Sequence, residues 1–443
     1  MTQSQRLTRR AALLLPLAAT GCETLDSIFG TKKEPLPGKR IAVVGESRGL
    51  KVDNPPDRRI ALPPPAPLPD SPQAGGNPSH VVGHPAVRER LEQAFQVSIG
   101  EGGGYRRKLT ARPVVAGGRI FTMDSDAVVT AFDLKSGGRI WRTETATDED
   151  DSTNVGGGIA VDGGIVYAAT GLAEMLAVDA ASGHIRWRKR LPTPARAAPT
   201  IAEDRLYIPT LDESLLAFAK SDGTKIWSFQ GAAAPTSMLG LPSPAYADGL
   251  VVAGFGSGEL VCLRAATGSV NWTDGLSAGR GRAALVEFSA IRGMPLIASS
   301  RVYAAGLGGL CVSLDLRSGR RLWEREFGSE QTMWLAGDWL FALTLDQQLV
   351  ALNAEDGTVA WVTQLPPYED MEKKKDPITW VGPALAGDRL IVAGSTKLAL
   401  SVSPYTGKIL GQQDLPGAAS VAPVVAAGMV LLVTNDGSLL ALR

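Results

Sequence analysis

Residues 112–141 read RPVVAGGRIFTMDSDAVVTAFDLKSGGRIW, and this stretch decides the fold. It holds three short apolar runs and a fourth that ends in an aromatic residue, each bounded by Gly, Asp or Ser. Those residues supply the tight turns that join neighbouring strands, and the runs are too short for helices. The stretch therefore predicts a four-stranded antiparallel meander.

The same sequence pattern recurs along the chain, and a tryptophan occupies the same place in six of its copies. Each of six tryptophans stands four residues after a glycine, and the six are Trp141, Trp187, Trp227, Trp272, Trp323 and Trp361. They are 46, 40, 45, 51 and 38 residues apart, which is the spacing of four-stranded propeller blades and excludes the shorter helical repeats.

Eight copies of the phrase are present, so we predict an all-β, eight-bladed propeller of four-stranded antiparallel blades. The copies begin near Pro113, Gly158, Pro199, Pro244, Pro295, Met333, Pro383 and Pro423. In the seventh copy Gly411 stands where tryptophan is expected. The eighth copy supplies three strands before Arg443, and Phe95 lies 46 residues before Trp141. We expect the strand around Phe95 to close the last blade, which leaves no unpaired sheet edge at the seam.

The repeated aromatic residues have a structural explanation. Burying an indole removes roughly 150–250 Å² from water, and the wedge between two blades needs a large flat side chain. We therefore interpret Phe95 and the six tryptophans as blade residues rather than as a binding set.

Composition limits the function classes. Lys plus Arg and Asp plus Glu both total 45, so no basic field is available for a polyanion, and nucleic acid is not an expected partner. Hydrophobic residues make up 44% of the chain, and no blade can bury its faces alone, so the repeats are expected to form a single domain. The runs Asp148–Asp151 and Lys373–Lys375 lie in connectors and are expected to be solvated.

The N-terminus predicts export and a lipid anchor. Arginines precede the apolar run 11–19, which is too short to span a bilayer and is followed by Ala19-Thr20-Gly21-Cys22. We read residues 1–21 as a lipoprotein signal peptide and Cys22 as the lipid attachment site. The alternative is a plain secretory peptide in which Cys22 is incidental. Glu23 favours retention in the outer membrane, so the expected location is its periplasmic face, held through the lipid anchor only.

Residues 22–90 are expected to be a tether. Prolines are dense in this stretch, and proline clusters favour extended polyproline II over a packed domain. Its more polar end, residues 73–80, is expected to pack against the ring, which would span residues 91–443. A proline-rich ligand for another domain is the alternative role.

The sequence offers few residues suited to catalysis or metal binding. The chain has three histidines, His80, His84 and His184, two of them in the tether, so no histidine metal centre is expected on the ring. Cys262 and Cys311 lie in the third strands of neighbouring copies and are read as buried free thiols, with a disulfide as the alternative. We assign no catalytic residue, no metal site and no cofactor, although a propeller can bring distant loops together at its axis.

The phrases 131–141, 314–323 and 351–361 resemble the quinoprotein-type propeller repeat. Two families share this repeat: alcohol dehydrogenases that bind pyrroloquinoline quinone (PQQ) and calcium, and the BamB lipoproteins of the β-barrel assembly machinery. The dehydrogenases carry a vicinal cysteine pair near the quinone, and this chain has none. Together with the lipoprotein signal and the single-ring length, the resemblance is to BamB over residues 73–443.

The resemblance implies a non-catalytic scaffold that docks on the insertase BamA and aids the assembly of outer membrane proteins. Other assembly-machinery lipoproteins and unfolded outer membrane proteins are further implied partners. Family members dock through loops that lead into the fourth and fifth blades, which here contain Met238, Leu239, Leu241, Arg280, Arg282 and Arg292. We expect the first three as exposed apolar anchors and the arginines as polar partners. The alternatives are a PQQ-dependent periplasmic oxidoreductase and a generic binding propeller; quinone absorbance, calcium content and insertase pull-down separate the three.

Overall fold

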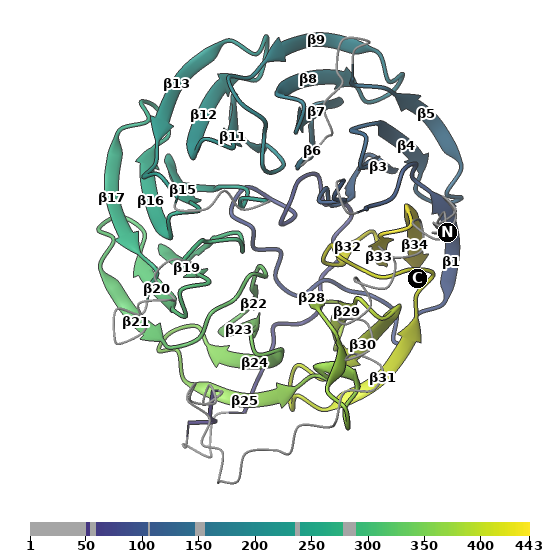
Figure 1. Ribbon diagram of the computed structural model, residues 1–443, viewed down its shortest axis with the longest axis vertical. Helices are drawn as coiled ribbons and strands as arrows, with labels where there is room; N and C mark the ends of the chain where they lie inside the picture. Colours follow the sequence, from purple (N-terminus) through teal and green to yellow (C-terminus); the bar gives the residue numbers. More distant parts are fainter. Residues whose placement is uncertain (1–49, 54–58, 105–106, 147–155, 235–239, 278–288) are drawn as a thin grey trace, which may run out of the picture. The chain divides into compact units, whose positions relative to one another are not determined.

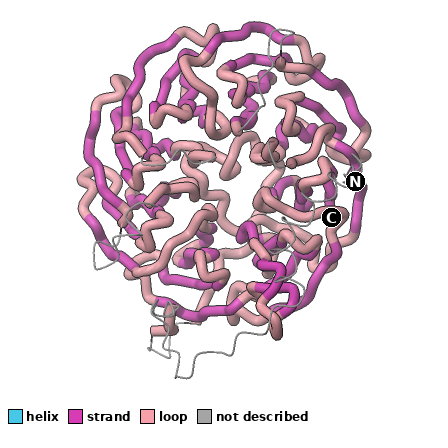
Figure 2. The backbone as a smooth tube through the Cα atoms, in the orientation of Figure 1, coloured by secondary structure: helices cyan, strands magenta, loops and turns pink. Residues whose placement is uncertain are grey.

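The repeated apolar runs fold into eight four-stranded antiparallel sheets arranged in a ring, which confirms the predicted eight-bladed propeller (Figure 1). The computed structural model describes residues 50–53, 59–104, 107–146, 156–234, 240–277 and 289–443, all within the unit Gly49–Arg443. These residues form strands, turns and loops (Figure 2). Among them, no helix has the length and apolar character needed to cross a bilayer.

Blades one to four each consist of four consecutive strands. Blade one contains β2 (Val114–Ala116), β3 (Arg119–Met123), β4 (Val129–Asp133) and β5 (Arg139–Thr143). Blade two contains β6 (Gly157–Asp162), β7 (Ile165–Thr170), β8 (Glu174–Asp179) and β9 (Ile185–Arg190). Blade three contains β10 (Thr200–Ala202), β11 (Arg205–Pro209), β12 (Ser214–Ala219) and β13 (Lys225–Gln230). Blade four contains β14 (Ala245–Ala247), β15 (Leu250–Gly254), β16 (Glu259–Arg264) and β17 (Val270–Gly275).

Blades five to seven follow the same order. Blade five contains β18 (Leu296–Ala298), β19 (Arg301–Ala305), β20 (Cys311–Asp315) and β21 (Arg321–Arg325). Blade six contains β22 (Trp334–Ala336), β23 (Trp339–Leu343), β24 (Gln348–Asn353) and β25 (Val359–Gln364). Blade seven contains β28 (Trp380–Leu385), β29 (Leu390–Gly394), β30 (Leu398–Val402) and β31 (Ile409–Asp414). Between blades six and seven, β26 (Tyr368–Asp370) and β27 (Lys375–Pro377) form a hairpin that carries the exposed run Lys373–Lys375.

Blade eight is closed by the N-terminal strand, as predicted. It contains β32 (Val424–Ala426), β33 (Met429–Thr434) and β34 (Ser438–Leu442), and β1 (Gln93–Ser98) pairs with β34 as the outer strand. Phe95 lies opposite Ala441, just as Trp141 lies opposite Ala131 in blade one. A Cβ added to Gly137 of blade one would lie 2.6 Å from the Phe95 ring. Phe95 therefore fills the place that tryptophan fills elsewhere.

The tryptophans join neighbouring blades. Five of the six are 7–9% exposed, and each of these five donates its indole N–H to a backbone carbonyl of the next blade. The donor and acceptor pairs are Trp141 to Ala180, Trp227 to Ala265, Trp272 to Leu316, Trp323 to Ala354 and Trp361 to Pro404. Trp187 is half-buried, and the corresponding carbonyl, that of Lys220, accepts from the Tyr167 hydroxyl instead.

The glycine of the repeated phrase is required by the tryptophan of the preceding blade. Gly183 has a φ of 79°, and a Cβ placed there would lie 2.7 Å from the Trp141 ring. Both the left-handed backbone and the close approach exclude larger residues. The glycine of one copy therefore packs against the tryptophan of the preceding copy, which places the two repeated residues in contact between adjacent blades.

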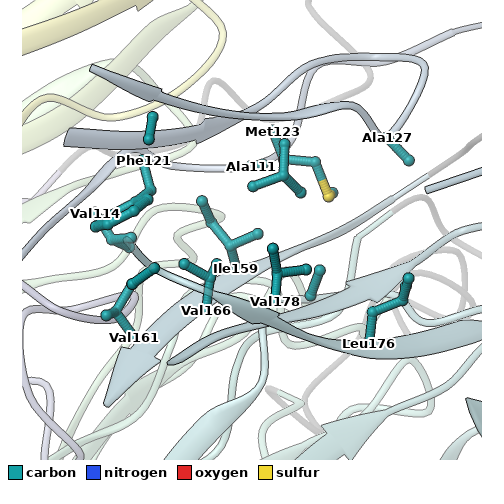
Figure 3. Close-up of a cluster of buried hydrophobic side chains, with 14 of the residues drawn as sticks. Ala111, Val114, Phe121, Met123, Ala127, Ile159, Val161, Val166, Leu176 and Val178 are labelled. Atoms are coloured by element: carbon teal, nitrogen blue, oxygen red, sulfur yellow. The ribbon is translucent and has the colours of Figure 1, made fainter. Parts of the chain in front are cut away.

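The core lies between the blades rather than at one centre. Figure 3 shows the cluster between blades one and two, where Phe121 and Met123 face Ile159, Val166 and Val178. Similar clusters lie between the other neighbouring blades. Each blade is consequently stabilised mainly by the two blades beside it.

Residues 68–85 run around the inside of the ring, with turns in residues 73–80, and we call this segment the strap. It contacts every blade through at least one hydrogen bond, in the order of blades eight, one, two and on to seven. Its bonds join Leu68 to Ala427, Ser71 to Val115, Pro72 to Val161, Gln73 to Ile201, Pro78 to Tyr246, Ser79 to Ile297, Gly83 to Trp334 and Pro85 to Gly387. Figure 1 shows this part of the chain as the purple trace through the middle of the ring.

The strap uses backbone groups that the blades leave unpaired. The first strand of each blade pairs with one neighbour, so its other edge faces the interior of the ring. Val115 both donates to and accepts from Ser71 across this edge, at 2.9 and 2.8 Å. Covering exposed strand edges removes sites for unwanted pairing. The expected tether of residues 22–90 is thus divided: residues 22–49 lie outside the described residues, whereas residues 68–85 line the ring and are not a free spacer.

Candidate functional site

Two of the six residues expected to bind a partner are brought together by the structure. Leu241, before blade four, and Arg292, before blade five, line the same cavity, which has a volume of about 170 Å³. Its walls come from the loops that lead into every blade except the seventh, together with Ala74 of the strap. The other four expected residues, Met238, Leu239, Arg280 and Arg282, lie outside the described residues.

Leu241 is not an exposed anchor, which corrects the expectation from sequence. Its side chain is 6% exposed, and its backbone N–H donates to the carbonyl of Arg196 at 3.4 Å. The Ser243 hydroxyl donates to the carbonyl of Ala198 at 2.8 Å. The end of this loop is therefore folded against the loop that leads into blade three, and its apolar side chain is used for packing.

Arg292 joins the loops before blades five and six. Its guanidinium lies 2.6 Å from the carboxylate of Glu330, and both side chains are partly exposed. The backbone N–H of Met294 donates to the Thr332 hydroxyl at 3.1 Å, which fixes the same two loops together. Because the pair is open to solvent, its contribution to stability is small, and it remains accessible to a charged partner.

Two further arginines, which the sequence analysis did not single out, face the same cavity. Arg112 comes from the loop before blade one, and its guanidinium donates to the Thr332 hydroxyl at 3.4 Å. Burial lowers the pKa of Arg112 to about 10. Burial also lowers the pKa of Arg196, an effect that the nearby Glu213 carboxylate opposes. The cavity walls thus carry three arginines against the single carboxylate of Glu330, which favours a negatively charged group at this face.

A sequence signal for these arginines exists in hindsight. Arg196 and Arg292 each stand three residues before the proline that begins a blade, Pro199 and Pro295, and Arg112 stands directly before Pro113. Aligning the six copies that begin with proline places all three in equivalent loops. Only closure of the ring shows that those loops meet around one cavity.

His80 of the strap is buried next to Arg112 and makes the protein sensitive to acid. Its Nδ1 lies 2.8 Å from the carbonyl of Pro295, and burial lowers its pKa from 6.5 to about 4, with the Arg112 charge adding to the effect. The unfolded chain therefore binds a proton more readily than the folded one between these pH values. We therefore expect the contribution of His80 to stability to be complete above about pH 6.5 and to fall by about 3 kcal/mol as the pH drops towards 4.

Replacement of His80 by Asn is expected to remove most of this pH dependence. Asparagine tolerates the left-handed φ of 61° at this position and can donate from a similar place. Urea unfolding at pH 7 and pH 4.5 measures the fall in free energy, which we expect to be smaller in His80→Asn than in the wild type. The exposed His184, changed to Asn, is the control. An equal fall in all three proteins would contradict a role for His80.

In the part of the chain that the structure describes, the cysteines and carboxylates form no metal site. Cys262 and Cys311 are buried free thiols, as expected, and burial raises the pKa of Cys262 to about 12 and that of Cys311 further. Such thiols are protonated at neutral pH and are unreactive. Within the described ranges, no group of three His, Cys, Asp or Glu side chains is placed to hold a metal ion. Cys22 lies outside these ranges.

Comparison with known proteins points to one family. The family model described as outer membrane protein assembly factor BamB matches residues 125–363 and 368–443. The BamB of Bordetella pertussis is 27% identical over 355 residues, which are 80% of this chain and 87% of that protein. The BamB of Yersinia pestis is 25% identical over 356 residues, which are 79% of this chain and 88% of that protein.

Solved structures show the same ring. The crystal structure of BamB from Moraxella catarrhalis superposes with a TM-score of 0.67 at 19% identity, covering 80% of this chain and all of that one. A quinohemoprotein alcohol dehydrogenase from Pseudomonas putida superposes with a TM-score of 0.68 at 13% identity, covering 84% of this chain and 80% of that one. At these identities the superpositions describe the fold alone.

Proposed function

The chain belongs to the family of the outer membrane protein assembly factor BamB, and we propose that it is a non-catalytic scaffold in outer membrane protein assembly. The observation that carries the proposal is the family match, which runs from blade one to blade eight. The ring architecture alone is shared with alcohol dehydrogenases and does not distinguish the two functions. Sequence relatives that match most of this chain are assembly factors.

The proposed location is the periplasmic face of the outer membrane, with Cys22 as the lipid-bearing residue. The support for this is the sequence Ala19-Thr20-Gly21-Cys22 after a short apolar run. Residues 23–67 would then connect the anchored cysteine to the strap. Within this connection, the N–H of Asp53 donates to the carbonyl of Val359 in blade six, and Ile60 and Leu62 pack between blades six and seven, so the connection would reach the ring at these blades before the strap enters its interior.

The proposed docking partner is a BamA-type insertase, with other lipoproteins of the assembly machinery alongside it. The proposed surface consists of the loops before blades four and five, including Met238, Leu239, Arg280 and Arg282. Two observations support it. Arg292 is partly exposed beside the cavity, and the arginines around that cavity favour acidic side chains on a partner. Leu241 is buried and helps to hold the end of the loop before blade four in place.

A charge swap tests this surface without breaking its ion pair. Purified insertase periplasmic domains on a resin are expected to retain the wild-type protein. Arg292 and Glu330 lie 2.6 Å apart, and the double variant Arg292→Glu with Glu330→Arg keeps opposite charges at these two positions but reverses their order. We expect its affinity to fall by about tenfold, the usual scale for one partly buried charged contact at an interface. Binding is measured by retention and by surface plasmon resonance.

The matched control is Arg317→Glu, an exposed arginine in the turn after β20 of the same blade. It changes the net charge but lies outside the cavity walls and should bind like the wild type. Equal binding by the swap variant would reject Arg292 as part of the docking surface. Failure of the wild type itself to bind would reject docking on the insertase.

A further inference from the structure

Blades one to six share a slot that an indole occupies, and the strand pairing beneath the indole is the same each time. The tryptophan of the outer strand lies over a small or slim residue of the third strand, with a register shift directly after that pair. The residues beneath the indoles are Ala131, Ala177, Ala217, Cys262, Ser313 and Ala351. In blade one the Trp141 ring also contacts Phe121 of the second strand and the facing side of blade two.

Blade seven keeps this slot but leaves it open. Gly411 lies opposite Ser401, with the same register shift after the pair. A groove of about 430 Å³ takes the place of the indole. Ile391 stands where Phe121 stands in blade one, and Val430, Leu432 and Leu442 of blade eight form the facing wall. We call this groove, between Gly411, Ser401 and Ile391 on one side and blade eight on the other, the open slot.

The glycine at this position is not imposed by the backbone. Gly411 does not have a positive φ, and a Cβ added to it would meet no atom within 4 Å. In contrast, a Cβ at Gly183 or Gly407 would lie within 3 Å of the tryptophan of the preceding blade. Gly411 thus leaves the position of the indole free of any side chain of its own strand. Leu91, from the segment before β1, also lines the groove and packs against the cluster between blades seven and eight.

We propose that the open slot binds an aromatic side chain carried by an extended segment of a partner polypeptide. The six filled slots of the same chain show which side chain such a space accepts. The groove volume lies within the range of ligand-binding pockets. Aromatic residues bury a large area and are the usual anchors in interface pockets. The partner is therefore recognised first by its aromatic residue.

The surroundings of the open slot suit an extended partner backbone. All six residues of β31 are exposed, and in the described part of the chain its outer edge is paired with no other strand. An extended segment can add to such an edge through main-chain hydrogen bonds. Glu89, Arg90, Gln412 and Gln413 at the rim provide polar groups around the anchor. This surface lies on blades seven and eight, so it is separate from the loops before blades four and five, and the proposal stands independently of insertase docking.

Binding of two short peptides to the full-length chain tests the proposal. The probe is a fluorescein-labelled peptide of sequence Thr-Val-Trp-Val-Thr, and the comparison peptide has Ala in place of Trp. Fluorescence anisotropy is expected to show about tenfold tighter binding of the Trp peptide, the effect of one buried aromatic anchor. Equal affinity for the two peptides would overturn the proposal.

The decisive variant is Gly411→Trp, which fills the open slot from within as in the other blades. We expect a higher melting temperature and loss of the preference for the Trp peptide, whereas Gly411→Ala should keep that preference. If Gly411→Trp fails to fold, Ser401→Met fills the same space from the third strand and should have the same effect on binding. A folded, filled variant that still prefers the Trp peptide would overturn the proposal.

Discussion

A chain that begins at Glu101 is expected to lose cooperative unfolding altogether. It lacks β1, so the outer edge of β34 is unpaired, and it lacks Phe95 next to Gly137. It also lacks the strap and at least one hydrogen bond to each of the eight blades. Because each blade depends on its two neighbours, one open seam exposes apolar surface on both sides. Circular dichroism and calorimetry should show a broad transition in place of a sharp one.

Two other truncations separate the contributions to this effect. A chain that begins at Leu50 keeps every described residue and should melt like the full-length protein. A chain that begins at Glu92 keeps β1 and its pairing with β34 but loses the strap, so we expect a sharp transition at a lower temperature. If the chain that begins at Glu101 melted as sharply and at the same temperature as the full-length protein, closure by β1 would not be needed.

The second large effect is expected for Trp323→Ala, which should lower the free energy of unfolding by about 3–5 kcal/mol, as for other large-to-small core changes. Trp323 is 8% exposed, and its indole donates to the carbonyl of Ala354 in blade six at 2.9 Å. Its ring centroid lies 6.1 Å from that of Tyr303. The change therefore removes packing within blade five and a bond to blade six together. Equilibrium unfolding in urea gives the difference.

Trp187→Ala is the matched comparison for this prediction. Trp187 occupies the equivalent position but is half-buried, and the carbonyl that would accept its indole N–H accepts from Tyr167 instead. We expect its cost to be clearly smaller than that of Trp323→Ala. Similar costs at the two sites would show that burial and the inter-blade hydrogen bond do not set the contribution of these residues.

The ring could be predicted because its main contact is periodic in sequence. Each glycine packs on the tryptophan one blade earlier, so the contact repeats whenever the blade repeats. Gly183 and Trp141, and likewise Gly407 and Trp361, are such pairs. The position of Phe95 in the outer strand of the last blade was predicted from the same spacing, and the pairing of β1 with β34 confirms it.

Packing of residues 73–80 against the ring was expected and is confirmed, but the path of the strap along all eight blades could not be predicted because it leaves no pattern of side chains. Pro72, Pro78 and Pro85 bind the blades through their carbonyl groups, which any residue possesses. Proline density indicated an extended conformation but gave no surface for it to follow. The proposed partner-binding loops were predicted only in part. Leu241 and Arg292 were identified from their positions in the sequence, whereas Arg112 and Arg196 reach the same cavity only after the ring has closed.

The strap and β1 also determine when this protein can complete its folding. His84 bonds to Gly387, 303 residues further along the chain, and Phe95 pairs with Ala441. Contacts between such distant residues form slowly, because a long loop must close before they add stability. In a chain made from its N-terminus, the strap can gain its contacts as blades one to seven form in sequence, whereas β1 is made early and pairs last. The ring therefore closes only when β34, the last strand, has been made.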